Sequence, residues 1–354
     1  MDFNVNNENQ LNEIVTPLIA WYGINKRDLP WRHNATPYRV WISEIMLQQT
    51  RVDPVIPYYL RFLETFPNVE SLADASEDLL MKHWEGLGYY SRARNLQKAA
   101  KVIVEMGSFP CDFEGWLKLP GIGKYTAGAI CSIALGLPTP AVDGNVLRVL
   151  SRVLGSTSDI ASEKTKEQFS KALAKIYPKE TSDFTQSLME LGATVCLPNG
   201  EPQCQKCPLA HMCVAYREGR IDEIPVKTPK KGRKIEEKAV LILRVGEKVA
   251  IQKRPEKGLL AKLWEFPNLP GLMSVCELQD CLLGAEYISA KEIGNAEHIF
   301  THIEWKMKGY EVQLNSEAPQ YHWVTIKDLL EEIAIPSAFR FYLQYLMNQR
   351  YEEL

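Results

Sequence analysis

Residues 119–146 read LPGIGKYTAGAICSIALGLPTPAVDGNV, and this stretch decides the fold of the first part of the chain. Two glycines, Gly121 and Gly123, stand two residues apart before an apolar run that predicts a helix from Thr126 to Leu135. Such a turn exposes backbone N–H groups at a helix start, an arrangement that binds phosphate. Glycine-rich turns also serve as ordinary helix connectors, so the motif alone leaves both interpretations open.

The second half of this stretch, PAVDGNV at 140–146, opens another helix. Asp143 is well placed as its N-cap, because the carboxylate can accept hydrogen bonds from the first backbone N–H groups. For a lone aspartate before a helix, capping is a more frequent role than catalysis.

Upstream, residues 40–50 (VWISEIMLQQT) place one carboxylate, Glu44, inside an apolar helix. A charged group seldom lies there without a partner or a task. Glu44 and Gln48 are four residues apart, so they are expected to share one helical face that points at a common cleft. Burial would raise the pKa of Glu44, which suits a general acid at neutral pH. A structural ion pair is the alternative.

The organisation of the 354 residues indicates two domains. Apolar positions recur at three- and four-residue intervals from Leu11 to about Ala215, which predicts an all-α domain over 1–218. Residues 219–235 mix charge, Pro and Gly and are expected to be a solvated linker. Residues 236–354 contain β-rich runs such as KAVLILRV and HIEWKMKGYEVQL, followed by a strand and a helix from Trp323 to Tyr345, and predict an α+β domain.

The net charge of −3 argues against a protein that coats nucleic acid without specificity, although a DNA enzyme can concentrate its cations on one face. The most apolar stretch is far too short to span a bilayer. The N-terminus, MDFNVNNENQ, lacks the order of a signal peptide, so we expect a cytoplasmic protein with no membrane partner.

Four of the eight cysteines lie within eighteen residues, at Cys196, Cys204, Cys207 and Cys213. Cytosolic thiols this dense usually bind metal rather than form disulfides. A set of four cysteines suits either zinc or a 4Fe-4S cluster, and the spacing leaves both open.

Together these segments resemble the helix–hairpin–helix DNA glycosylases, and more closely the adenine DNA glycosylase (MutY) family. The resemblance covers nearly the whole chain and includes RDLPWR at 27–32, WISEIMLQQTRV at 41–52, WEGLGYYSRARNL at 84–96, LLAKLWEFP at 259–267 and HIFTHIEW at 298–305. It implies an all-α glycosylase domain with a 4Fe-4S loop at 196–213, followed by a Nudix-like domain. After Pro267 the sequence has no Glu-rich box of the kind that holds metal in Nudix pyrophosphatases, so this domain is expected to read the mismatch rather than hydrolyse nucleotides.

Two departures from the family pattern are present. Seven residues separate Cys196 from Cys204 where the family usually has six, which a surface loop can absorb. The mismatch-reading motif, usually Phe-Ser-His, is Phe300-Thr301-His302 here, and threonine keeps the hydroxyl. The likeness favours a 4Fe-4S cluster over zinc.

The resemblance also implies roles for particular residues. Glu44 would protonate adenine and Asp143, kept ionised by its helix N-terminus, would stabilise the sugar cation, while Tyr125 and Asn145 orient them. The remaining implied sites are the adenine pocket (Arg27, Leu29, Trp31, Glu190), the DNA wedge and 8-oxoguanine reader (Gln48, Gln49, Thr50, Leu87, Tyr89, Phe300, Thr301, His302), the phosphate-binding hairpin (Gly121, Gly123, Lys124) and the cluster ligands (Cys196, Cys204, Cys207, Cys213).

The implied activity is excision of adenine paired with 8-oxoguanine or guanine in duplex DNA by a monomer, and the sequence does not identify any protein partner. The endonuclease III branch has lysine where this chain has Tyr125, so a glycosylase without lyase activity is expected. The rival functions are a bifunctional glycosylase-lyase, a nucleotide-pool pyrophosphatase and a DNA-binding protein without catalysis. A binder needs no buried acid, and the pyrophosphatase needs the acidic box.

Overall fold

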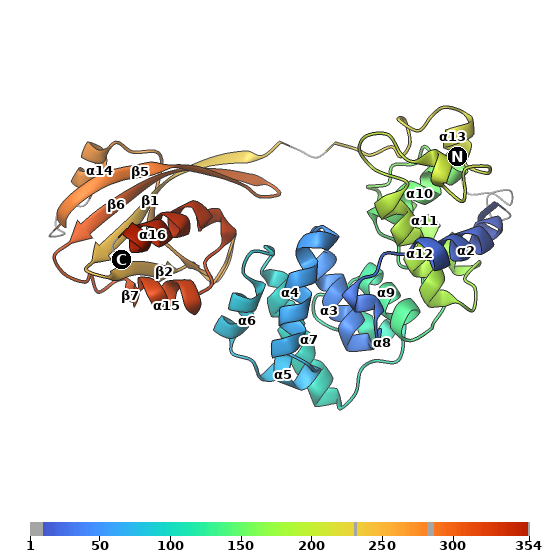
Figure 1. Ribbon diagram of the computed structural model, residues 1–354, viewed down its shortest axis with the longest axis horizontal. Helices are drawn as coiled ribbons and strands as arrows, with labels where there is room; N and C mark the ends of the chain where they lie inside the picture. Colours follow the sequence, from blue (N-terminus) through green and yellow to red (C-terminus); the bar gives the residue numbers. More distant parts are fainter. Residues whose placement is uncertain (1–9, 230–231, 282–286, 353–354) are drawn as a thin grey trace. The chain divides into compact units, whose positions relative to one another are not determined.

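The computed structural model describes residues 10–229, 232–281 and 287–352. The chain divides into two compact units, one built from Met1–Asp74 and Asn95–Pro229 and the other from Ala75–Arg94 and Lys230–Leu354 (Figure 1). The first unit is helical and the second contains a mixed sheet, which confirms the expected fold class. Residues 75–94 pack with the sheet although they lie early in the chain; the expected domain boundaries stay a prediction.

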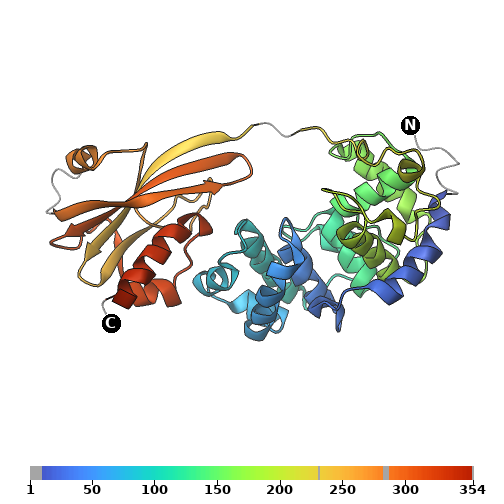
Figure 2. The same ribbon diagram turned by 45° about the horizontal axis from the view of Figure 1, so that its top comes forward.

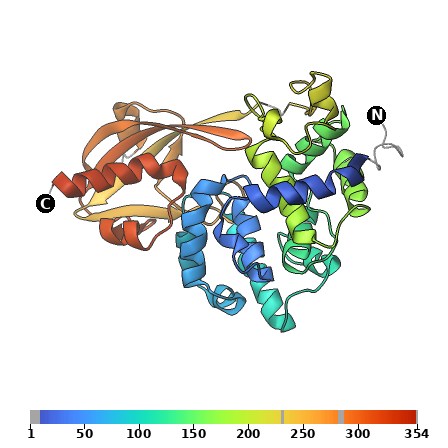
Figure 3. The same ribbon diagram turned by 45° about the vertical axis from the view of Figure 1, so that its right-hand side comes forward.

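The first unit is a bundle of mostly short helices. They are α2 (Val15–Asn25), α3 (Pro37–Leu47), α4 (Val52–Thr65), α5 (Val69–Asp74), α8 (Phe113–Leu117), α9 (Lys124–Ala134), α10 (Gly144–Leu154), α11 (Glu163–Ala174), α12 (Thr181–Thr194) and α13 (Val214–Arg217), with 3-10 turns η1 (Pro30–Arg32) and η2 (Cys204–Lys206). Helix α7 (Ser91–Met106) begins in the second unit and ends in the first. Helix α2 lies along α12 (Figure 3).

Helix α10 lies in the centre of the first unit, and every residue from Val146 to Leu154 is buried. Its start is fixed by Asp143, whose side chain accepts a hydrogen bond from the Val146 N–H, so the expected N-cap is confirmed. Its end is fixed by Gly155, which has a φ of 65°, a conformation that glycine adopts without strain. Helices α2, α11, α12 and α13 bury their apolar faces around it.

The second unit is built on a seven-stranded mixed sheet in the order β3-β2-β1-β6-β5, with β4 paired to β1 and β7 paired to β2. The long strands β1 and β6 are parallel, and the other pairs are antiparallel. The strands are β1 (Lys234–Val245), β2 (Lys248–Lys253), β3 (Trp264–Glu265), β4 (Asn268–Pro270), β5 (Tyr287–Ile299), β6 (Ile303–Leu314) and β7 (His322–Thr325), and the helices are α6 (Glu77–Trp84), α14 (Val275–Cys281), α15 (Ile326–Glu331) and α16 (Arg340–Glu352), with the 3-10 turn η3 (Ser337–Phe339).

Both faces of this sheet are covered, which explains the continuous apolar run in β1. Val240 and Ile242 face the core formed with α15 and α16, whereas Leu241 and Leu243 face the core formed with α14. Successive side chains of a strand point to opposite faces, so a strand buried on both sides needs no polar alternation. Figure 2 shows α16 on one side of the sheet and α14 on the other.

The expected solvated linker differs from the structure in its first part. Ile224 is buried, and its carbonyl accepts a hydrogen bond of 2.8 Å from Arg152 Nε on α10. Val226 O accepts from the Ile160 N–H, and Thr228 Oγ1 donates to Asp159. Residues 221–228 therefore pack on the first unit, while β1 already begins at Lys234, and the linker at 219–235 stays a prediction.

Within the described residues, the helices fall short of the length and apolar character that crossing a membrane requires.

We predict that Gly128→Ala destabilises the first unit. A Cβ on this α9 residue would lie 2.1 Å from the backbone oxygen of Pro140, which cannot move aside as a flexible side chain can. Overpacking of this kind is expected to lower the free energy of unfolding by about 2 kcal/mol, which thermal denaturation would detect. The matched control is Gly23→Ala in α2, where nothing lies within 4 Å of the new Cβ. Equal stability of the two variants would contradict the packing described here.

Candidate active site and cysteine loop

Glu44 lies on α3 and is buried, with 5% of its surface exposed. Tyr125, the second residue of α9, donates a hydrogen bond of 2.7 Å from its hydroxyl to Glu44 Oε2. The expected acid in an apolar helix is therefore present, and the partner it meets is a neutral phenol rather than a cation.

Burial raises the pKa of Glu44 to about 7. The hydrogen bond from Tyr125 stabilises the ionised carboxylate and lowers the pKa, whereas the negative charge of Asp143 raises it. Both carboxylates also raise the pKa of Tyr125, after burial itself. The three groups therefore lie within electrostatic reach of one another, although they are contributed by α3, α9 and the start of α10.

Asp143 combines its capping role with a second hydrogen bond. Its Oδ1 accepts from the Val146 N–H at 2.8 Å, and its Oδ2 accepts from Asn145 Nδ2 at 2.9 Å. Burial nevertheless raises the pKa of Asp143 above its usual range, because loss of water around the carboxylate outweighs these hydrogen bonds. The hydrogen bonds at the helix N-terminus still lower this pKa, and the expectation that they keep Asp143 ionised stays a prediction.

The glycine turn joins α8 to α9 and forms the expected hairpin. Gly121 has a φ of 77°, and a Cβ there would lie 2.6 Å from Cβ of Asn95, so both conformation and space require glycine. Gly123 is the N-cap of α9, and Lys124 is the first residue of this helix, two positions before the expected start at Thr126. Both are exposed, so the start of α9 faces solvent.

Gln48 lies just beyond the end of α3 rather than within it, because the helix ends at Leu47. The expected shared helical face of Glu44 and Gln48 is therefore wrong in detail. Both side chains still contact α9, since Gln48 Nε2 donates to Thr126 Oγ1 at 3.2 Å. The next residue, Gln49, has a φ of 60°, and Thr50 Oγ1 donates to the Gln48 carbonyl.

Glu190 on α12 is buried and held by two arginines. Arg27 forms a fork, with Nε and Nη2 donating at 2.7 and 2.9 Å, and Arg32 Nη2 donates at 2.8 Å. Burial alone would raise the pKa of Glu190, but the hydrogen bonds from these arginines lower it to about 2. Arg32 was not among the expected site residues. It belongs to the segment RDLPWR at 27–32, and only the fold shows that both arginines of this segment bind Glu190.

Leu29 and Trp31, the apolar members of the expected adenine pocket, are buried. Trp31 belongs to the 3-10 turn η1, and its ring meets that of Tyr59 edge-on at 5.5 Å. The RDLPWR segment therefore has charged side chains at both ends, of which Arg27 and Arg32 bind Glu190, and buried apolar side chains between them.

In the second unit, the turn after α6 is supported by buried polar groups. Arg92 Nη2 donates to the carbonyls of Leu87 and Gly88, and Trp84 Nε1 also donates to Gly88 O. Burial lowers the pKa of Arg92 to about 10. Leu87 is buried, whereas Tyr89 has a φ of 48° and is 46% exposed, so the turn presents a tyrosine ring to solvent.

Residues 300–302 form the turn between β5 and β6. Phe300 packs edge-on against His298 and Trp305, at 4.6 and 4.9 Å. The Thr301 hydroxyl lies 3.0 Å from the Tyr89 hydroxyl, so two of the expected recognition residues are hydrogen-bonded to each other. His302 is exposed.

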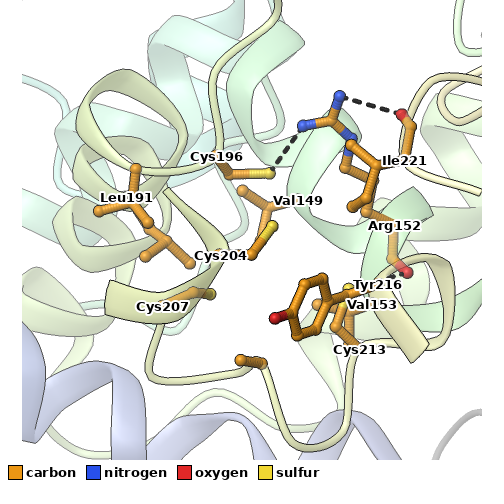
Figure 4. A pocket seen from close by; sticks show the side chains of 12 residues that line it. Val149, Arg152, Val153, Leu191, Cys196, Cys204, Cys207, Cys213, Tyr216 and Ile221 are labelled. Atoms are coloured by element: carbon orange, nitrogen blue, oxygen red, sulfur yellow. Dashed lines mark hydrogen bonds between the residues drawn. The ribbon is translucent and has the colours of Figure 1, made fainter. Parts of the chain in front are cut away.

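All four clustered cysteines line one pocket, together with Arg152 of α10 (Figure 4). Arg152 Nη1 donates to Cys196 Sγ at 3.3 Å, and Arg148 Nε donates to the carbonyl of Cys196 at 2.7 Å. The four thiols are free of disulfides. Over residues 10–229, 232–281 and 287–352, no three His, Cys, Asp or Glu side chains are close enough to hold a single metal ion.

Comparison with known families matches both parts of the chain. Residues 42–178 match the family described as "HhH-GPD superfamily base excision DNA repair protein". Residues 239–345 match the family described as "NUDIX domain". The first match contains Glu44, Tyr125 and Asp143, and the second contains residues 300–302.

Individual relatives extend the match over most of the chain. A protein of Arabidopsis thaliana called "Adenine DNA glycosylase" is 36% identical over 85% of this chain and 57% of its own length. One from Buchnera aphidicola subsp. Schizaphis graminum with the same name is 39% identical over 71% of this chain and 73% of its own length. This chain thus spans somewhat more than half of the Arabidopsis protein.

Among solved structures, a non-covalent endonuclease III–DNA complex aligns with a TM-score of 0.52 and 26% identity, covering 60% of this chain and 97% of that chain. The likeness therefore includes the backbone arrangement of the helical unit as well as the sequence. Since the sequence likeness to the Buchnera protein covers nearly three quarters of that relative, this chain belongs to the adenine DNA glycosylase (MutY) family of the helix–hairpin–helix superfamily.

Proposed function

We propose that this protein is a monofunctional DNA glycosylase that excises adenine paired with 8-oxoguanine or guanine in duplex DNA. The observation that carries the proposal is the buried Glu44 carboxyl with a pKa near 7, hydrogen-bonded to Tyr125 within reach of the Asp143 carboxyl. The names of the relatives support the substrate class.

The start of α9 is the proposed contact with the DNA backbone. Gly121, Gly123 and Lys124 are exposed there, and a helix N-terminus attracts phosphate through its free N–H groups and its dipole. A backbone contact fixes the position of the duplex without reading its sequence. The likeness to an endonuclease III–DNA complex is consistent with this mode of binding.

The adenine must leave the base stack, because its glycosidic bond cannot be reached within the duplex. We propose that Gln48, with Gln49 and Thr50 beside it, enters the vacated space, since this turn after α3 adjoins the start of α9 through Thr126. The extruded base is received by Arg27, Leu29, Trp31 and Glu190. The low pKa of Glu190 keeps it ionised, so it and its arginines offer fixed charges and donors for the base edge.

Glu44 supplies the proton. In its neutral form it donates a proton to N7 of adenine, which makes the base a better leaving group as the bond between the sugar and the base breaks. Asp143, as a carboxylate, stabilises the positive charge that develops on the sugar or bonds to it. The ionised Glu44 then takes a proton from water, whose oxygen bonds to the sugar. Where Asp143 had bonded to the sugar, this attack breaks that bond and releases the carboxylate, and Glu44 is neutral again.

Tyr125 and Asn145 hold these two acids in place. The hydroxyl of Tyr125 donates to Glu44, and the amide of Asn145 donates to Asp143. A phenol cannot form the Schiff base that a lysine forms with the sugar, and Lys124 lies one residue away, about 100° around the helix. We therefore propose that the enzyme leaves the DNA backbone intact.

The base opposite adenine is read by the second unit in this proposal. Tyr89 is exposed on its turn, Thr301 offers a hydroxyl, and Phe300, His302 and Leu87 complete the surface. The hydrogen bond between Tyr89 and Thr301 supports their joint role. A hydroxyl at 301 can donate and accept, which suits an edge of guanine or 8-oxoguanine.

We propose that Cys196, Cys204, Cys207 and Cys213 hold a 4Fe-4S cluster. Four thiols surround a shared pocket, and the cationic Arg152 contacts one of them, as the negative charge of bound thiolates favours. A bound cluster would cross-link this loop. The residues themselves anchor the loop to α10 through Arg148 and Arg152.

The central test is base release in single-turnover assays with duplexes that carry adenine opposite 8-oxoguanine or guanine. Wild type should release adenine from both and leave strands that break only after alkali, with no borohydride-trapped complex. Glu44→Gln should lose at least about a thousandfold in rate because it lacks the proton, while binding to the duplex persists. Full activity of Glu44→Gln would refute the role of the acid, and trapping of wild type would refute the monofunctional assignment.

The pKa of Glu44 predicts the pH profile. The protonated form is active, so the single-turnover rate should be highest below about pH 7 and fall about tenfold per unit above it. Tyr125→Phe removes a hydrogen bond that lowers this pKa, so the fall should move to higher pH. The rate should also fall in acid as Asp143 takes up a proton. A flat profile in wild type, or a shift to lower pH in the variant, would contradict this assignment.

The cluster proposal predicts about four irons and four acid-labile sulfides per purified chain. Cys207→Ser removes one thiol from the pocket and should lower iron content and thermal stability. The matched control is Cys111→Ser, because Cys111 is exposed and lies outside the pocket. One zinc per chain with no iron would replace the proposed cluster by a structural zinc site.

A further inference from the structure

The last turn of α6 is hydrogen-bonded to the end of α15 by a partly buried cation. Lys82 Nζ donates to the carbonyl of Leu330 at 2.8 Å and to that of Ile333 at 3.0 Å. Helix α15 ends at Glu331, so the Leu330 carbonyl belongs to its last turn, where carbonyls lack intrahelical partners, and Ile333 lies just beyond the helix. A lysine at this position satisfies them and complements the negative end of the helix dipole.

Glu85, the C-cap of α6, completes this attachment. Its Oε2 lies 2.8 Å from Lys82 Nζ, and its Oε1 accepts a hydrogen bond of 2.9 Å from the Ile335 N–H. The exposed fractions of the two side chains are 23% and 26%, so the pair is largely shielded from water. Lys82 and Glu85 together therefore bind backbone atoms over residues 330–335.

Residues 330–335 share one apolar core with the 300–302 turn. Ile335 is fully buried there, and Phe300 packs against the same core. Trp305 joins the two parts, because its ring lies 4.9 Å from that of Phe300 and 6.0 Å from that of Phe339. Side chains in a close-packed core cannot move independently of one another. Contacts that hold residues 330–335 in place therefore also restrain the 300–302 turn.

A second attachment lies at the other end of the same segment. The turn that follows α6 carries Tyr89, and its hydroxyl lies 3.0 Å from that of Thr301. The segment from Lys82 to Tyr89 thus contacts the rest of the second unit at two separate places, one at residues 330–335 and one at Thr301. Two attachments fix the orientation of a segment, whereas one would leave it free to turn.

We propose that Lys82 and Glu85 are positioning residues for recognition of the base opposite adenine. They hold the Tyr89 turn and the Phe300–His302 turn in one orientation, so that the two turns meet the opposite base as a single preformed surface. Neither residue touches the reacting base. The inference rests on the proposed function, because it concerns discrimination between 8-oxoguanine and guanine during adenine excision.

The test is the ratio of single-turnover rate constants for adenine opposite 8-oxoguanine and opposite guanine. Lys82→Met removes both carbonyl contacts and the ion pair, so fewer molecules hold the competent orientation. We expect the ratio to fall by at least about fivefold, with the rate opposite guanine changed by less than about twofold. A loss of folded protein would lower both rates alike and leave the ratio unchanged.

Glu85→Gln is a second variant, in which the side chain keeps its shape but loses its charge. It should also lower the ratio of the two rate constants. The double variant should lose less than the product of the single losses, because both disrupt one ion pair. The matched control is Glu77→Gln. Glu77 lies on α6, as Lys82 does, and pairs with Arg94 of α7, so this variant breaks a different ion pair and should keep the wild-type ratio.

The outcomes separate this inference from the proposed function. Absence of adenine release from both duplexes by wild type would refute the proposed function itself. Release at equal rates from both duplexes would refute the inference alone. So would folded Lys82 and Glu85 variants whose ratios stay within about twofold of wild type. Failure of both variants to fold would also overturn it, since the pair would then be needed for folding.

Discussion

Burial of the Glu44 carboxyl is the constraint on which the candidate site depends. A carboxyl removed from water keeps its proton near neutral pH, and here the neighbouring carboxylate of Asp143 adds to that effect. The surrounding helices supply a phenol hydroxyl to Glu44 and an amide to Asp143, and the positive charge of Arg148 lowers the pKa of Asp143 without offsetting its burial. The site therefore combines a proton donor, Glu44, with a group that can act as an anion, Asp143. A close ion pair at Glu44 would have kept that carboxyl ionised and removed the proton donor.

Helix α10 connects this site to the cysteine loop. Asp143 caps its start, and Arg148 donates to the Asn145 side chain and to the carbonyl of Cys196. One turn further on, Arg152 donates to Cys196 and to the segment that leads toward the second unit. A buried arginine destabilises the fold unless its N–H groups are hydrogen-bonded. In the buried part of α10, backbone carbonyls accept most of the hydrogen bonds that Arg148 and Arg152 donate. The loop and the carboxylate site are consequently built on the same rigid element.

In the second unit, too, exposed side chains are held in place by buried neighbours. A sheet covered on both faces supports a short turn at 300–302, and the α6 segment is bonded to the same body. The exposed Tyr89 ring is carried by a turn whose carbonyls are bonded to the buried Arg92. Side chains suited to contact with a ligand are thus held by neighbours that do not reach solvent.

The sequence by itself determined the helical and α+β parts, the capping role of Asp143, the hairpin and the grouping of the four cysteines. These features depend on local periodicity and spacing. Only the tertiary structure decided what each polar group meets. It placed Tyr125 against Glu44, ended α3 before Gln48, brought Arg32 to Glu190 and packed residues 221–228 on the first unit. It also showed that burial raises the pKa of Asp143, since desolvation depends on atoms that are distant in sequence.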